Sequence, residues 1–292
     1  MKKSLRIILI FWVSLGYSQD SQELIDFIVN KNSFHSDCVG SACEESELYR
    51  KWVLLKSKLT DEELIELSKN EEAVLRAYSI RELIANEKYP ATELLKFELS
   101  KSESVESYDG CLIDTDELAS IVYHEYWNKI RIESLKDVSD SEKERNEAMS
   151  RILRTDPQME KLDSFIIYAN EPQNFVIYRR VFTNRIHKEK YNNQIFKLVS
   201  ENNNFSAFRY LNKNYPEKYK SEFKDYFRTK FQSAEFTTEF ELYDLLAFIE
   251  YLIKSENNEF KELAVNKLKT DDSWKSLESW FMESLDKNGI KL

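Results

Sequence analysis

The sequence predicts an all-α protein built from stacked antiparallel helix pairs, and three observations predict it. The 292-residue chain has only four glycines and four prolines, whereas sheets joined by tight turns need more of both. Each proline precedes a helical pattern, where its missing N–H costs little. Apolar residues recur at intervals of three and four over most of the chain, which is the spacing of amphipathic helices.

Residues 1–18 have the pattern of a secretory signal peptide. Three basic residues precede an apolar core at 7–15, and small residues follow it. This core is shorter than the roughly 20 residues that a membrane-spanning helix needs. We therefore expect cleavage near Ser18/Gln19 and export to the periplasm or out of the cell. No later stretch is apolar enough to span a membrane, so we expect no transmembrane segment in the mature chain.

The three cysteines include one candidate disulfide, because an exported chain reaches an oxidising compartment. Cys38 and Cys43 flank four small residues that can form a tight loop. A bridge between them would contribute about 2 kcal/mol by the chain-entropy argument. Cys111 would then be left as a buried thiol. The alternatives are that all three are unpaired, or that Cys111 pairs with either of the others.

The stretch 60–83 predicts two helices joined by a tight turn. Thr60 and Glu63 have the spacing of a capping box, so a helix begins here. Residues 70–72 form a polar break, after which the apolar spacing resumes. The second helix has its apolar residues at helical intervals, namely Val74, Leu75, Tyr78, Ile80 and Leu83.

This helix pair resembles a HEAT-type repeat, whose second helix has a Val-Arg, then a small residue and a leucine. Here the corresponding positions are Asn70, Leu75, Arg76, Ser79 and Leu83. The match covers about one repeat. The whole chain is similar, more loosely, to exported HEAT-repeat proteins of Bacteroidetes-like bacteria, of the armadillo type. The resemblance implies an irregular α-solenoid and no defined activity.

The rest of the chain predicts further helix pairs. Residues 91–107 form a drifted copy of the opening unit, and Asp114 and Glu117 cap a helix that runs through Trp127. The charge-rich stretch 136–146 lacks an apolar stripe, so we place a boundary between 19–135 and 136–292, with the second array continuing the first.

In the second half, aromatic residues occupy many of the apolar helix positions. A stripe at four-residue spacing predicts a buried helix face, namely Tyr215, Tyr219, Phe223, Phe227 and Phe231. Thr238 and Glu241 form one more capping box. A helix that contains Trp274 and Phe281 closes the array.

Motifs of catalysis and of cofactor or metal binding are lacking. No two of the three histidines have ligand spacing, and there is no glycine-rich phosphate loop. The acids between Asp109 and Glu117 lack the order of a calcium loop and read as helix-start residues. We therefore expect no cofactor, no metal and no enzymatic activity.

Charge narrows the choice of partner. Residues 19–135 have 25 acids and 13 bases, whereas 136–292 have 27 and 26. So acidic a first half disfavours nucleic acid or an anionic membrane as its partner. A basic segment at 179–197 stands out, and we select four of its residues as a candidate dock for an acidic protein, peptide or glycan: Arg179, Arg180, Arg185 and Lys188. The alternative is a solvated helix face.

The function that the sequence favours is an exported, non-catalytic scaffold that presents a helical surface to a protein or peptide, including an acidic one. Stacked helix pairs form an extended concave surface without preparing a catalytic group. Two rival functions remain: a binder of an envelope glycan or small ligand, and an enzyme with an unrecognised carboxylate site.

The mature chain should begin within a few residues of Gln19. N-terminal mass spectrometry of protein from its native host measures this directly. An intact Met1 in the envelope fraction would overturn the signal-peptide assignment.

Overall fold

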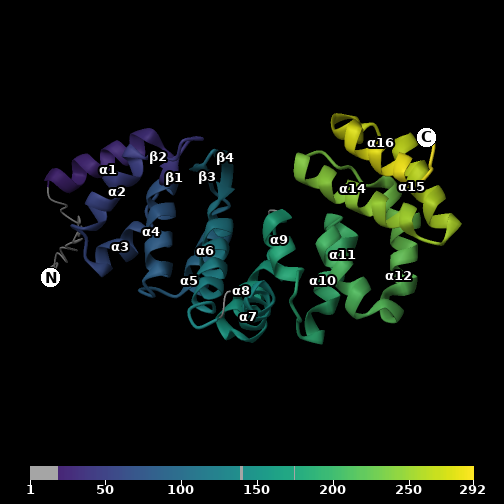
Figure 1. Cartoon of the computed structure of the whole chain (residues 1–292), viewed down its shortest axis with the longest axis horizontal. Coiled ribbons are helices and arrows are strands. Elements are labelled where there is room, and N and C mark those ends of the chain that lie inside the picture. Colours follow the sequence, from purple (N-terminus) through teal and green to yellow (C-terminus); the bar gives the residue numbers. More distant parts are fainter. Residues whose placement is uncertain (1–18, 139–140, 174) are drawn as a thin grey trace, which may run out of the picture. The chain divides into compact units, whose positions relative to one another are not determined.

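The computed structural model describes residues 19–138, 141–173 and 175–292 (Figure 1), so the expected signal peptide lies outside the described residues. The described chain forms two compact units. Unit 1 comprises residues 19–79 and 104–116, and unit 2 comprises 80–103 and the residues from 117 onward. The boundary that the sequence places at residue 136 lies inside unit 2.

Unit 1 combines helices with a small sheet. Its elements are α1 (Gln19–Lys31), β1 (Ser33–Val39), β2 (Glu44–Glu45), α2 (Glu47–Lys56), α3 (Asp61–Leu67), the first half of α4 (Ala73–Ala85), β3 (Ser104–Gly110) and β4 (Leu112–Glu117). The strands are in the order β2-β1-β3-β4. β1 pairs antiparallel with β2 and parallel with β3, with His35 opposite Tyr108.

This sheet shows that the predicted all-α solenoid of helix pairs is wrong. The helix pair expected at 91–107 has only its first helix, which ends at Lys101, where Ser102 has a left-handed backbone; strand β3 takes the place of the second helix. Asp114, read as a helix-start residue, belongs to β4, whereas Glu117 ends β4 and is also the N-cap residue of the following helix, without a side-chain capping hydrogen bond. The sequence pattern does not indicate these strands, because they are short and mostly polar. In addition, β1 pairs with a strand about seventy positions away.

The core of unit 1 is centred on Tyr78 of α4. Its ring lies 5.0 Å from that of Trp52 and 4.9 Å from that of Phe34. Its hydroxyl accepts a hydrogen bond of 2.9 Å from the backbone N–H of His35. One aromatic side chain therefore joins helices α2 and α4 to strand β1, and it is fully buried.

The two helices predicted in 60–83 are present. α3 begins with the predicted capping box, in which both the Thr60 and the Glu63 side chains bond to the backbone. Arg76 is fully buried, and its Nη1 donates to the carbonyls of Asn70 at 2.8 Å and Glu71 at 3.0 Å. Arg76 thus fixes the turn that precedes α4.

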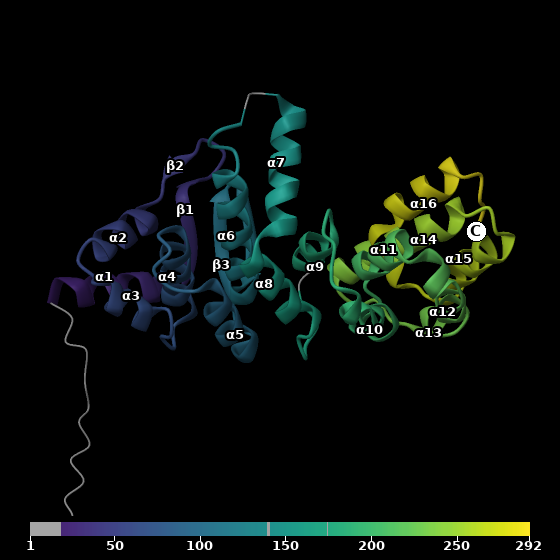
Figure 2. The same cartoon turned by 90° about the horizontal axis from the view of Figure 1, so that it is seen from below.

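Unit 2 is helical in its described residues. Its elements are the second half of α4, α5 (Ala91–Lys101), α6 (Leu118–Glu133), α7 (Glu142–Thr155), α8 (Pro157–Ile167), α9 (Phe175–Phe182), η1 (Glu189–Tyr191), α10 (Asn192–Asn202), α11 (Phe205–Asn214), α12 (Pro216–Arg228), α13 (Lys230–Ser233), α14 (Glu239–Lys254), α15 (Asn258–Thr270), η2 (Ser273–Leu277) and α16 (Glu278–Lys287). Neighbouring helices pack pairwise, as α6 does on α7 and α10 on α11 (Figure 2).

The predicted aromatic stripe forms the core of unit 2. Phe223 and Phe227 pack edge-on against Phe208 at 4.7 and 5.4 Å, and Phe227 lies 5.8 Å from Phe248 of α14. Phe231 is buried as well, although α12 ends before it. α14 begins with the predicted Thr238–Glu241 capping box.

Within the described ranges, no helix combines the length and apolar character needed to cross a bilayer.

Leu75→Ala should destabilise the protein by about 2–5 kcal/mol, because Leu75 is buried in α4 and its truncation leaves a cavity. Leu54→Ala in α2 is the matched control, since that leucine is 48% exposed and its change should cost under about 0.5 kcal/mol. Urea unfolding measures both. Equal costs for the two variants would contradict the packing described.

Candidate functional site

The structure separates the four residues of the predicted basic dock. Arg179 is exposed on α9, and the Arg180 guanidinium lies 4.8 Å from the ring centre of Trp127. Arg185 is buried, and Lys188 pairs with Glu160 of α8. The segment is therefore not one basic face, and only Arg179 and Arg185 line a common cavity.

Arg185 is held by a buried carboxylate. Its Nε donates to Asp163 Oδ2 at 3.0 Å, its Nη2 bonds to the same oxygen, and the hydroxyl of Tyr123 donates to Oδ1 at 2.7 Å. Burial raises the pKa of Asp163 to about 6, while Arg185 and Tyr123 oppose that rise. Asp163 is thus ionised at neutral pH and pairs with the guanidinium. This pair joins α8 to the loop 183–188.

His187 fixes the far end of the same loop. Its Nε2 is 2.8 Å from the carbonyl of Val181, so Nε2 carries the proton. Its backbone N–H donates to the hydroxyl of Tyr210 on α11 at 2.9 Å. Burial lowers the pKa of His187 to about 4, so the ring is neutral near pH 7. His187 therefore acts as a structural link between α9 and α11.

The loop 183–188 forms one wall of a cavity of about 370 Å³ within unit 2. The other walls come from the end of α7 and from α9, α11 and α14. Within the described part of the chain, the lining residues include five cations and no carboxylate: Arg154, Arg179, Arg185, Arg209 and Lys213. Neutral polar groups complete the set, namely Thr183, Asn184, Ser206, Tyr210, Asn214 and Tyr243. We call this the cationic cavity.

The charges of the cationic cavity are poorly compensated. Arg154, Arg179, Arg209 and Lys213 form no ion pair with any residue in the described part of the chain. Many other cations of unit 2 do, such as Lys254 with Glu250. Glu142 and Glu147 share a neighbouring depression with Arg154, and Glu239 accepts a hydrogen bond from the lining residue Tyr243. An anion in the cavity would therefore relieve a repulsion that the protein leaves in place.

Arg185 provides a second, independent indication of an anion site. It is 6% exposed and lines the cavity. Its Nη1 is buried and has no hydrogen-bond partner among the described residues. A buried donor without a partner is costly, and native structures contain few of them.

Sequence reasoning missed Arg154, Arg209 and Lys213, since they lie on α7 and α11, outside the basic segment. The one local signal was the four-residue spacing of Arg209 and Lys213, which places both on one helix face. The convergence of these cations on Arg179 depends on how the helices pack.

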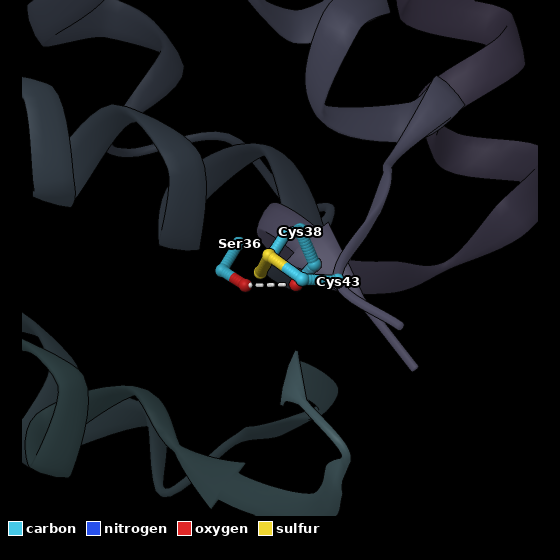
Figure 3. The surroundings of a disulfide bond; sticks show 3 residues. All are labelled: Ser36, Cys38 and Cys43. Carbon is cyan, nitrogen blue, oxygen red and sulfur yellow. Dashed lines mark hydrogen bonds between the residues drawn. A yellow bond between two sulfur atoms is a disulfide. The ribbon is translucent and has the colours of Figure 1, made fainter. Parts of the chain in front are cut away.

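The other predicted site lies in unit 1. Cys38 at the end of β1 forms a disulfide with Cys43, and Ser36 Oγ donates to the Cys38 carbonyl at 2.7 Å (Figure 3). The loop needs positive φ angles, which Gly40 adopts without strain. Cys111 is free and exposed, so the expectation that it is buried is wrong. It lies in the turn between β3 and β4, at the surface of the sheet.

A second buried acid supports the walls of the cationic cavity. Asp244 of α14 is 8% exposed, and the backbone N–H of Phe205 at the start of α11 donates to it. Its Oδ1 has no partner among the described residues. Burial raises the pKa of Asp244 to about 7, with a further rise from Glu241. Asp244 therefore joins α11 to α14.

Comparison with protein-family models, curated proteins and solved structures finds no match to this chain. The resemblance of 60–83 to a HEAT-type repeat stays a prediction. The function is inferred below from the geometry of the cationic cavity.

Asp244→Asn should remove a pH dependence of stability. In the folded protein the carboxyl keeps its proton up to about pH 7, whereas in the unfolded chain it loses the proton near pH 3.8. Between these two pH values folding therefore takes up a proton. The stability due to this group is greatest below pH 3.8 and falls as pH rises to about 7. Between pH 5 and pH 8 the wild type should lose about 2–3 kcal/mol more unfolding free energy than the variant.

Urea unfolding of both proteins at several pH values measures this difference. His187, whose pKa is lowered, contributes stability that is lost as pH falls from 6.5 to about 4. That contribution is common to both proteins, so it cancels in the comparison. Parallel pH curves for the two proteins would refute the assignment of a buried, protonated Asp244.

Proposed function

We propose that the protein is an exported, non-catalytic binding protein that takes up an acidic segment of a protein or peptide in the cationic cavity. The observation that carries this proposal is the convergence of five cations, without a carboxylate, on one cavity. Its volume of about 370 Å³ is within the range of ligand pockets. It accommodates a few side chains of a partner.

The residue types suit carboxylates. A guanidinium is a planar fork of donors that binds both oxygens of a carboxylate at once. Four arginines line the cavity, and Arg179 and Arg209 are exposed at neighbouring elements, where an incoming chain can reach them. Asn184 and Asn214 add amide groups that can pair with a peptide backbone.

Catalysis is not proposed for this cavity. Of the residues that the structure describes, those that line it include no carboxylate, imidazole or thiol that could act as a general base. Burial raises the pKa of Tyr210, the one phenol tied to His187, to about 12, so this hydroxyl stays protonated. The cavity can hold charge and orient a partner, which supports binding.

Replacing Arg179, Arg209 and Lys213 together by Gln should weaken binding of a fluorescein-labelled oligoglutamate peptide about tenfold or more. Each lost charge-assisted hydrogen bond is worth about 1.5–3 kcal/mol, and 1.4 kcal/mol is a factor of ten. Fluorescence anisotropy titrations at low and high salt measure the effect. Wild-type affinity should fall as salt rises, and the variant should show a shallower dependence.

In the matched control, Gln replaces three exposed lysines of unit 2 that do not line the cavity, namely Lys197, Lys220 and Lys230. It changes the net charge equally and should bind almost as the wild type does. Equal losses in both triple variants would mean that net charge, and not the cavity, governs binding. That result, or no binding by the wild type, would refute the proposed site.

A further inference from the structure

An aromatic ridge leads from the cationic cavity to the surface of unit 2. Phe175 of α9 and Tyr243 of α14 line the cavity, with ring centres 6.5 Å apart. Phe175 stacks on Phe240 at 6.4 Å, and Tyr243 meets Trp280 of α16 edge-on at 6.2 Å. Phe240 is 39% exposed and Trp280 is 57% exposed. We call these four rings the aromatic ridge.

The loop that lines the cavity adds an exposed apolar side chain. Ile186 lies in the loop 183–188, lines the cavity and is 72% exposed. The buried Asp163–Arg185 pair and the His187 contacts hold the residues on both sides of it. An exposed isoleucine on a fixed loop and an exposed tryptophan are typical of contact surfaces, where aromatic anchors supply most of the affinity.

Charge gives this surface a direction. The cations line the cavity, whereas acids lie close to the rings of the ridge. Glu239 accepts a hydrogen bond of 3.0 Å from Tyr243 and directly precedes Phe240, and Glu278 and Glu283 belong to the same helix as Trp280. A carboxylate is attracted to the cavity and repelled at the ridge. A ligand therefore binds with its acidic part in the cavity and an uncharged, apolar part over the rings.

We infer that the partner is a peptide segment in which acidic residues stand next to a large apolar or aromatic side chain, which packs on the aromatic ridge. This inference rests on the proposed function and adds the second half of the recognition motif. Burial of an aromatic side chain against such rings adds affinity that salt does not screen. The ridge thus supplies specificity among the many acidic chains that the cavity attracts.

A peptide fits these groups better than an acidic glycan does. Sugar hydroxyls donate hydrogen bonds, and the cavity lining has no carboxylate to accept them. Sugars also stack on free, parallel ring faces. In the ridge Phe175 and Phe240 face each other, and Tyr243 and Trp280 meet at 69°. The four rings therefore do not form one flat platform for a sugar.

The test compares two fluorescein-labelled peptides, one with glutamates beside a tryptophan and one with serine in place of that tryptophan. The wild type should bind the tryptophan peptide about tenfold more tightly. Phe240→Ala with Trp280→Ala should abolish this advantage and leave both the serine-peptide affinity and the salt dependence unchanged. The matched control is Ile132→Ala with Tyr168→Ala, two exposed residues of unit 2 that line none of the cavity, and it should keep the advantage.

The outcomes separate the two proposals. If the wild type binds both peptides equally, or if the advantage survives the ridge substitutions, the ridge inference is wrong while the cavity stands. If neither peptide binds, or if the Arg179, Arg209 and Lys213 changes leave both affinities intact, the proposed function falls and the inference with it. Tighter binding of an oligogalacturonate than of either peptide, lost in the same cation variant, would overturn the peptide assignment.

Discussion

The buried ion pair between Asp163 and Arg185 is the interaction on which the candidate site depends. Two guanidinium nitrogens and the hydroxyl of Tyr123 satisfy the carboxylate. Removing one partner of such a pair leaves a buried charge and typically costs about 3–5 kcal/mol, so the arrangement is strongly fixed. With Arg185 anchored, Asn184 and Ile186 on either side of it are held at the cavity wall.

The same pair explains how five cations can share one cavity. Arg154, Arg179, Arg209 and Lys213 are exposed, so water and salt screen their mutual repulsion. Arg185 is the buried member, and it alone has a carboxylate of its own. The aromatic side chains Phe182, Phe205 and Tyr210 line the cavity together with the cations, and Phe182 and Tyr210 are buried. Repulsion is thus kept tolerable without the acids that would cancel the positive potential.

Local sequence rules predicted the parts of the fold that depend on local interactions. The capping boxes at Thr60 and Thr238 and the buried aromatic stripe of α12 are of this kind. The sheet of unit 1 does not depend on local interactions, because β1 and β3 are polar and each becomes a strand only beside the other. Nothing in the sequence near Cys111 distinguished a buried thiol from one in the exposed β3–β4 turn that it occupies.

The candidate site was predictable only in part for the same reason. Arg179 and Arg185 look alike in the sequence, yet one is exposed and the other is buried against an acid on α8. A signal did exist, since Asp163 and Asp244 both interrupt apolar helix faces, and a buried acid needs a donor from elsewhere. Which donor supplies it, and which cations gather around it, depends on tertiary packing.

The parallel pairing of β1 with β3 also sets the order in which the chain can fold. Unit 1 is discontinuous, since residues 80–103 of unit 2 are inserted between its two segments. As the chain emerges from its N-terminus, β1 has only the two-residue β2 beside it until residues 104–110 follow. Closing so long a loop delays the sheet until late, whereas the helices of unit 2 form from neighbours in sequence. Unit 1 therefore completes its sheet only after the whole of the inserted segment has been made.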